Sequence, residues 1–134
     1  MIGLDTNVIA RIVLLDDLVQ SRAALDLVAH VKLSREQLVV SLSTLLELEW
    51  VMRSNAKHTK TQALLVFRQL LEVRDIQIDG EAILEHALLY WEGSNVDFAE
   101  CLFLAQYQHL GCSAMLTFDA KAARMEGVEL VASA

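Results

Sequence analysis

The chain has 134 residues, of which 54% are hydrophobic and 22% are charged. This length is typical of a single domain with its own core, and the composition excludes a disordered chain. The 18 acidic and 11 basic residues give a formal net charge of −7, which argues against tight non-specific binding of nucleic acid. A nuclease is not excluded, because a divalent metal ion neutralises much of a carboxylate-rich site.

Hydropathy and cysteine usage indicate where the protein works. No apolar run is long enough to cross a bilayer, and the N-terminus has no basic lead, so we expect neither a membrane protein nor a signal peptide. A cytoplasmic protein follows. Cys101 and Cys112 have no metal-binding spacing and lie among apolar residues, so we expect both to be buried free thiols. The histidines are scattered, which argues against zinc.

The first half of the chain alternates between short apolar runs and helical patterns. The expected elements are a buried strand over 1–4, a buried helix over 8–15, a helix over 18–31, a strand over 38–41 and a helix over 43–53. Asp16 and Asp17 are expected to separate the first two helices. In the second helix, the spacing of Ala23, Ala24, Leu27 and Val28 predicts the buried face.

The second half continues the same alternation. The expected elements are a helix over 60–72, a strand over 76–78, a helix over 80–91, a loop over 93–95, a helix over 97–110, a strand over 114–117, a short helix over 120–125 and a strand over 128–131. Gly111 is expected to end the long helix in a left-handed conformation.

Alternation of helices with short, continuously apolar strands predicts a parallel sheet covered on both faces. The sequence contains no repeat, linker or low-complexity segment. We therefore expect one α/β domain over residues 1–134, a three-layer α/β/α sandwich with a short central parallel sheet.

Acids follow several of the predicted strands, and ligands of open parallel sheets bind beyond the carboxyl ends of the strands. Asp5 follows the first strand, where Thr6 and Asn7 can hold its oxygens by hydrogen bonds. The other acids are Glu47 and Glu49 after the second strand, Asp97 and Glu100 at the start of the long helix, and Asp119 after the strand over 114–117.

Helical geometry limits which of these acids can act together. Glu47 and Glu49 are about 200° apart around a helix axis, so both cannot face one site, and spacing alone does not choose between them. Asp97 and Glu100 share a face. A group of such carboxylates without nearby lysine or arginine needs a counter-charge, and a divalent metal ion is the natural one.

Helix capping is the alternative explanation for each acid. Asp5 or Thr6 can cap the helix that follows, and Asp119 can cap the helix over 120–125. The phrase from Thr44 to Glu47 matches a capping box, and the phrase from Asp97 to Glu100 is a close relative of one.

The four acidic motifs, in this order, resemble a PIN domain over essentially the whole chain. They are Leu4-Asp5-Thr6-Asn7, Ser43-x-x-x-Glu47 leading to Trp50, Asp97-Phe98-Ala99-Glu100, and Leu116-Thr117-Phe118-Asp119. The single-domain length and the phrase from Leu46 to Val51 resemble the VapC-type toxins of bacterial toxin–antitoxin modules.

The resemblance implies an endoribonuclease that depends on Mg²⁺ or Mn²⁺, with RNA as substrate, inhibited by a cognate VapB-like antitoxin and usually homodimeric. It selects Glu47, not Glu49, as the second acid. Its catalytic acids are Asp5, Glu47, Asp97, Glu100 and Asp119. Among these we assign the metal to Asp5 with Asp97 or Glu100, whereas Glu47 and Asp119 orient waters or hold a second metal. Thr6, Asn7 and Thr117 support the site. The family commonly has aspartate where Glu100 stands.

Two other functions remain alternatives. A phosphatase or phosphotransferase with an aspartyl nucleophile of the haloacid-dehalogenase type needs a second acid two residues after Asp5, where Asn7 stands. A catalytically weak or inactive PIN-like interaction module would use its acids only as caps.

Two groups of residues carry further alternatives. One apolar group is interpreted mainly as core, with a dimer or antitoxin groove as the alternative: Trp50, Leu64, Phe67, Leu70 and Trp91. A basic group is either a solvated helix end or a rim that guides a polyanion: Arg53, Lys57, His58, Lys60 and Arg68.

Overall fold

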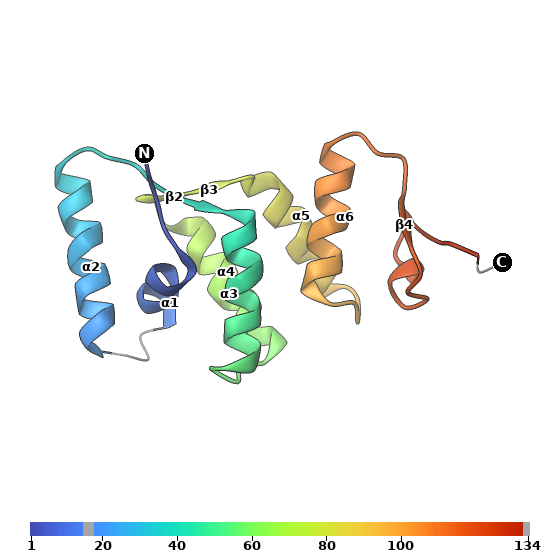
Figure 1. Cartoon of the computed structure of the whole chain (residues 1–134), viewed down its shortest axis with the longest axis horizontal. Helices are drawn as coiled ribbons and strands as arrows, with labels where there is room; N and C mark the ends of the chain where they lie inside the picture. Colours follow the sequence, from blue (N-terminus) through green and yellow to red (C-terminus); the bar gives the residue numbers. More distant parts are fainter. Residues whose placement is uncertain (15–17, 133–134) are drawn as a thin grey trace. The chain divides into compact units, whose positions relative to one another are not determined.

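The computed structural model describes residues 1–14 and 18–132, so the predicted break at Asp16 and Asp17 lies outside the described residues. The chain forms two compact units, Met1–Glu81 and Ala82–Ala134 (Figure 1). None of the described helices is both long and apolar enough to cross a membrane.

The first unit contains the helices and strands predicted for its sequence, with small shifts at their ends. Its elements are β1 (Ile2–Gly3), α1 (Thr6–Leu14), α2 (Leu18–Leu33), β2 (Leu38–Ser41), α3 (Leu42–Ser54), α4 (Lys60–Glu72) and β3 (Ile76–Asp79). The bounds of β2 and α4 agree with the prediction. Thr59 begins α4 with a capping box, in which its side chain and that of Gln62 each accept a backbone N–H.

The strands of the first unit form a three-stranded parallel sheet in the order β1-β2-β3. The central strand β2 is buried on the face that carries Val40, whose side chain is fully buried. Figure 1 shows β2 and β3 side by side, as their pairing requires. The buried side chains that surround the sheet include Leu38, Leu45, Leu48, Met52, Phe67, Leu70, Ile76 and Ile78. The predicted core positions at Leu64, Phe67 and Leu70 are confirmed.

The first strand is less buried than predicted. Met1 is 85% exposed and Ile2 39% exposed, and burial begins only at Leu4. The reason is position: β1 is a two-residue edge strand, paired in its sheet with β2 alone. An apolar run at an edge is not distinguishable by composition from one at the centre of a sheet.

The buried face of α2 also differs from the prediction. Ser21, Ala24 and Val31 are buried, whereas Ala23 and Leu27 are exposed. The inward stripe therefore uses small side chains, which let α2 pack closely against α1. Larger apolar residues on the other faces, such as Leu33, remain in solvent.

The second unit is a pair of helices followed by a small sheet. Its elements are α5 (Glu81–Glu92, whose first residue belongs to the first unit), α6 (Phe98–His109), β4 (Met115–Thr117), the 3₁₀ turn η1 (Ala122–Arg124) and β5 (Val128–Leu130). The strands β4 and β5 pair in parallel. Leu104, Met115 and Val128 form a buried cluster between α6 and the strands. Trp91 is buried, as predicted, and its ring packs against Phe98 with centroids 5.1 Å apart.

Local signals in the second unit were mostly correct. Gly111 has φ +89 directly after α6, which confirms the left-handed helix end. The predicted helix over 120–125 is wrong, because this segment forms only a single 3₁₀ turn. Cys101 is buried as predicted, but the prediction for Cys112 is wrong: it is exposed because it lies in the turn that follows Gly111.

The mixed α/β class with a parallel sheet is confirmed. In the described residues, hydrogen bonds divide the strands into a three-stranded and a two-stranded sheet, and all neighbouring strands in both are parallel.

Candidate active-site carboxylates

Asp5 lies where β1 gives way to α1. Leu4 still donates its backbone N–H to Val39 of β2 at 2.9 Å, and the Asp5 carbonyl then accepts the first helical bonds from Val8 and Ile9. The Asp5 carboxylate is exposed and accepts the Thr6 N–H on Oδ1 at 2.7 Å. This bond confirms that Asp5 satisfies one free N–H of the helix start, through one of its two oxygens. Thr6 is itself buried at 2% exposure, whereas Asn7 is exposed.

Ser41, not Thr44, caps α3. The Ser41 Oγ accepts the Thr44 N–H at 3.2 Å and lies 3.0 Å from the Thr44 hydroxyl. The predicted capping box from Thr44 to Glu47 is therefore wrong, because the helix starts at Leu42, directly after β2. Glu47 falls in the second turn of the helix, and its carboxylate has no capping role.

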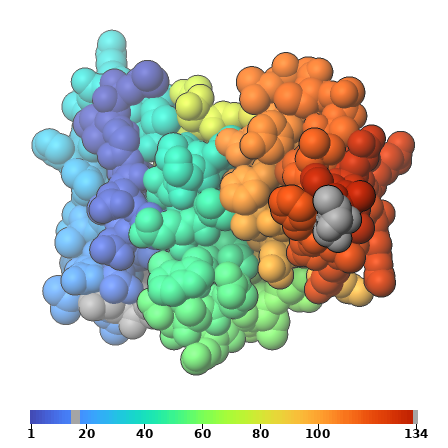
Figure 2. Space-filling view, turned by 45° about the vertical axis from the view of Figure 1, so that its right-hand side comes forward, coloured from blue at the N-terminus to red at the C-terminus, as the bar shows by residue number. Residues whose placement is uncertain are grey.

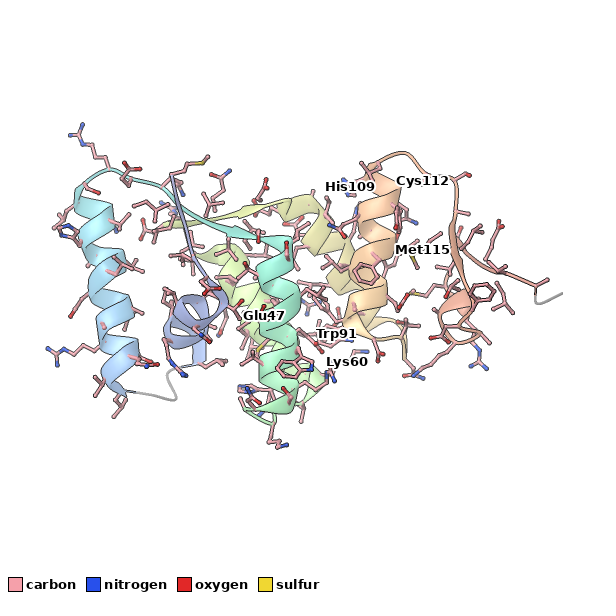
Figure 3. The ribbon with its side chains drawn as sticks, viewed as in Figure 1. Glu47, Lys60, Trp91, His109, Cys112 and Met115 are labelled. Carbon is pink, nitrogen blue, oxygen red and sulfur yellow. The ribbon has the colours of Figure 1, made fainter. Side chains whose placement is uncertain are left out.

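Glu47 and Glu49 differ in their environments. Glu49 is 6% exposed and its carboxylate pairs with Arg53, with Nε–Oε1 at 3.1 Å and Nη2–Oε2 at 3.4 Å. Glu47 is exposed to solvent, and Figure 3 labels it in the middle of α3. The ion pair gives Glu49 a structural role, which leaves Glu47 as the accessible acid of this helix.

The topology of the first unit brings Asp5 and α3 to the same edge of the sheet. Because β1 and β2 are parallel, with Gly3 opposite Val39, the residues that follow both strands emerge on one side. The helices that follow, α1 and α3, pack against each other. Asp5 and Glu47 are thus carried by neighbouring elements.

In the second unit, Asp97 is the N-cap residue of α6, but its side chain makes no capping hydrogen bond. Its carboxylate is exposed, and only its backbone carbonyl enters the helix, accepting the Cys101 N–H at 3.2 Å. Glu100 lies on the first turn and is half-buried. The predicted capping-box relative is wrong at Asp97, because its carboxylate oxygens accept no N–H of the helix.

Asp119, in contrast, does cap the turn that follows it. Its Oδ1 accepts the Lys121 N–H at 2.8 Å and the Ala122 N–H at 3.4 Å, while its own N–H donates to Thr117 Oγ1 at 3.0 Å. The capping alternative is confirmed for this residue. Thr117 therefore fixes the backbone of Asp119 and, through it, the carboxylate.

The chemistry of these side chains suits a hard divalent cation, since all five are carboxylates and Mg²⁺ prefers oxygen ligands. The acids that pair with a cation in the described part of the chain include Glu36, Glu49 and Asp75. Within each unit, and among the described residues, no three histidine, cysteine, aspartate or glutamate side chains lie together as a metal-binding group. Asp5 and Glu47 lie in the first unit, and Asp97, Glu100 and Asp119 lie in the second.

One contact was missed from the sequence. His86 Nδ1 and His109 Nε2 lie 3.0 Å apart on the exposed sides of α5 and α6, with ring centroids separated by 5.0 Å; Figure 3 labels His109. Their separation of 23 positions in the chain gives no local signal, because the pairing depends on how two helices pack.

A parallel α/β fold with exposed acids after its strands is typical of proteins that bind a ligand or a divalent metal ion beyond the strand ends. The model of the PIN domain family matches residues 2–128, so the chain belongs to the PIN domain family. PIN domains are generally metal-dependent nucleases. None of the curated proteins matches the chain.

Proposed function

We propose that this protein is an endoribonuclease that hydrolyses RNA phosphodiester bonds with Mg²⁺ or Mn²⁺, acting in the cytoplasm as the toxin of a VapC-type toxin–antitoxin pair. The observation that carries the proposal is the state of Asp97. A carboxylate at a helix N-cap normally accepts a backbone N–H, whereas this one makes no capping bond. Its exposed oxygens are available to a cation.

The proposed roles are those that the resemblance to the PIN domain family implies. Asp5, with Asp97 or Glu100, ligates the metal; Glu47 and Asp119 orient water molecules or hold a second ion. A bound metal ion supplies a low-pKa water and neutralises charge on the phosphate. Thr6 orients the Asp5 carboxylate through its N–H, Asn7 lies beside it in the chain, and Thr117 holds Asp119. One oxygen of Asp5 and one of Asp119 remain for ligation.

The biological partners are part of the same proposal. The resemblance supports inhibition by a VapB-like antitoxin, whose arginine would compete with the metal for the carboxylates, and a homodimer. Leu64, Phe67, Leu70 and Trp91 are buried in the core, so we do not propose them as the lining of a partner groove. A small neighbouring gene for a DNA-binding antitoxin is the observation that tests the toxin role.

We expect Mn²⁺ to bind the protein in isothermal titration calorimetry, and the heat to be lost in Asp5→Asn and reduced in Asp97→Asn. The charge-neutral variants remove an anionic ligand but keep the size of the side chain. Asp26→Asn, at an exposed acid of α2, is the matched control and should titrate like the wild type.

The titration also tests the second candidate function, an inactive PIN-like interaction module. The capping bonds of Asp119 and the bond from Thr6 to Asp5 favour it. Such a module would bind no Mn²⁺ through its carboxylates, so heats identical in the wild type and in Asp5→Asn would support it over the nuclease.

The two acids of α3 give a paired prediction. We expect Glu47→Gln to lower the rate of RNA cleavage on the order of 100-fold without changing the melting temperature. Glu49→Gln should keep the cleavage rate but lose the ion pair to Arg53, which costs about 1 kcal/mol of stability. Cleavage assays and thermal unfolding of both variants check this, and the reverse pattern would assign the catalytic role to Glu49.

A further inference from the structure

The charge of the chain is unevenly distributed. Residues 50–71 contain no acid and four of the 11 basic residues, leaving seven bases against 18 acids elsewhere. This stretch comprises the end of α3, the turn to α4 and most of α4. In a protein with a net charge of −7, it is the region where a polyanion meets the least repulsion.

The turn from α3 to α4 is held in a defined conformation. The His58 N–H donates to the Met52 carbonyl at 2.8 Å, and the capping box at Thr59 closes the other side. Between them, Lys57 is exposed and adopts a left-handed backbone with φ 55. This conformation is unfavourable for a lysine. The presence of Lys57 in the turn is therefore not explained by its backbone conformation.

An exposed tryptophan lies on α3 between Glu47 and this turn. Trp50 is 53% exposed, whereas the other tryptophan, Trp91, is 6% exposed. The Ser54 hydroxyl donates to the Trp50 carbonyl at 2.6 Å, one turn further along. Trp50 is three residues after Glu47, and so lies next to it on the helix surface. Trp50 is therefore the one member of its predicted apolar group that does not belong to the core, whereas the other four are buried.

The side chains therefore follow an order along α3 and the turn after it: an acid at Glu47, an aromatic ring at Trp50 and a cation at Arg53 on the helix, and a second cation at Lys57 in the turn. Six residues of α-helix, from Glu47 to Arg53, span about 9 Å. Arg53 is paired with Glu49, so we take the exposed Lys57 as the cation that meets a phosphate. Side chains of α3 and of the turn lie at the surface of the molecule and are seen in green on the face that Figure 2 shows.

We propose that Trp50 and Lys57 bind the single-stranded RNA substrate beside the site of cleavage, with Trp50 stacking on a base and Lys57 pairing with a phosphate. The inference rests on the proposed function and names the surface that holds the substrate. Single strands are generally bound by cations that follow the backbone, together with aromatic rings on which the bases stack. The exposed neighbours of Trp50 toward the turn are polar, namely Arg53, Asn55 and Lys57, which fits a nucleic acid better than an apolar partner.

The test of Trp50 uses the full-length protein in EDTA, where no cleavage takes place, with a short fluorescein-labelled single-stranded RNA. We expect Trp50→Ala to weaken binding roughly 5- to 100-fold in fluorescence anisotropy, and Trp50→Phe to restore most of it. Leu65→Ala, which removes a 57% exposed side chain from α4, is the control and should bind like the wild type. An oligonucleotide of the same length without bases should lose its dependence on Trp50.

The test of Lys57 has a matched control in the same unit. Arg35 is also an exposed base with a left-handed backbone, at φ 62. Glycine suits both positions, so Lys57→Gly and Arg35→Gly each remove one positive charge without strain. We expect only Lys57→Gly to weaken binding and to reduce the slope of log K against log salt by about 0.7, for RNA with or without bases.

The results separate the inference from the proposed function. Unchanged RNA binding in Trp50→Ala and Lys57→Gly, with wild-type cleavage still dependent on Asp5, would overturn the inference alone. A Trp50→Ala variant with normal RNA binding but a changed mass in light scattering would make Trp50 part of an interface between copies, and would overturn it too. A wild-type protein that neither binds nor cleaves RNA would overturn both.

Discussion

Asp5→Asn is expected to abolish RNA cleavage, with a loss of at least about 1,000-fold, while the protein stays folded. Asparagine keeps an oxygen at the position of Oδ1, so the bond from the Thr6 N–H is retained and α1 starts normally. The lost property is the negative charge, which a metal ligand requires and a helix cap does not. Cleavage of a labelled RNA in Mg²⁺ and in Mn²⁺, together with thermal unfolding of the same sample, measures both effects.

The Asp26→Asn variant controls for loss of charge in general, because Asp26 is an exposed acid of α2 in the same unit. Cleavage by Asp5→Asn at the wild-type rate, with metal supplied, would remove Asp5 from the site. An aspartyl phosphotransferase would lose activity in the same variant, but its wild type would form a phosphoryl-enzyme with acetyl phosphate. A nuclease that uses a metal-activated water forms none.

The largest effect on stability is expected for Phe67→Ala. Phe67 is fully buried on the inner side of α4, and removing such a ring costs about 3–5 kcal/mol through lost burial and the cavity that remains. For a chain of this length the melting temperature should fall by roughly 10–20 °C. Leu65→Ala on the exposed side of the same helix should shift it by less than about 2 °C.

Differential scanning calorimetry of the two α4 variants checks this prediction. Equal shifts in Phe67→Ala and Leu65→Ala would contradict the assignment of the buried face of α4. A residual cleavage rate near that of the wild type, measured below the melting point of Phe67→Ala, would show that the ring supports the fold and not the chemistry.

Strand and helix positions were predictable wherever one local signal decided them. The β-branched run at Leu38–Ser41 and the helical spacing in Lys60–Glu72 both specify their elements. The α2 face was not predictable in the same way, because its apolar residues fit two overlapping stripes. Which stripe turns inward depends on the small side chains that α1 accepts.

The candidate site was predictable as a set of acids but not as a set of environments. Parallel topology places acids after strands, which predicted Asp5 and the pair of Glu47 and Glu49. The family resemblance then selected Glu47. The sequence did not show that Ser41 would cap α3 or that Arg53 would pair with Glu49. It also did not show that one carboxylate oxygen of Asp119 would accept N–H groups of the turn that follows it. Each of these depends on the residue at which an element begins, which is the least certain part of any prediction from periodicity.

Ser41 is both the last residue of β2 and the N-cap of α3, so no loop separates the strand from the helix. A helix joined in this way cannot pivot without breaking the hydrogen bonds of the central strand. Glu47 and Trp50 therefore lie on a helix that is joined directly to the central strand, and their separation is fixed before a ligand binds. Any change of conformation during binding must then come from the single-stranded substrate, which is the more flexible of the two molecules. Preorganisation of this kind lowers the entropic cost of reaching a reactive geometry.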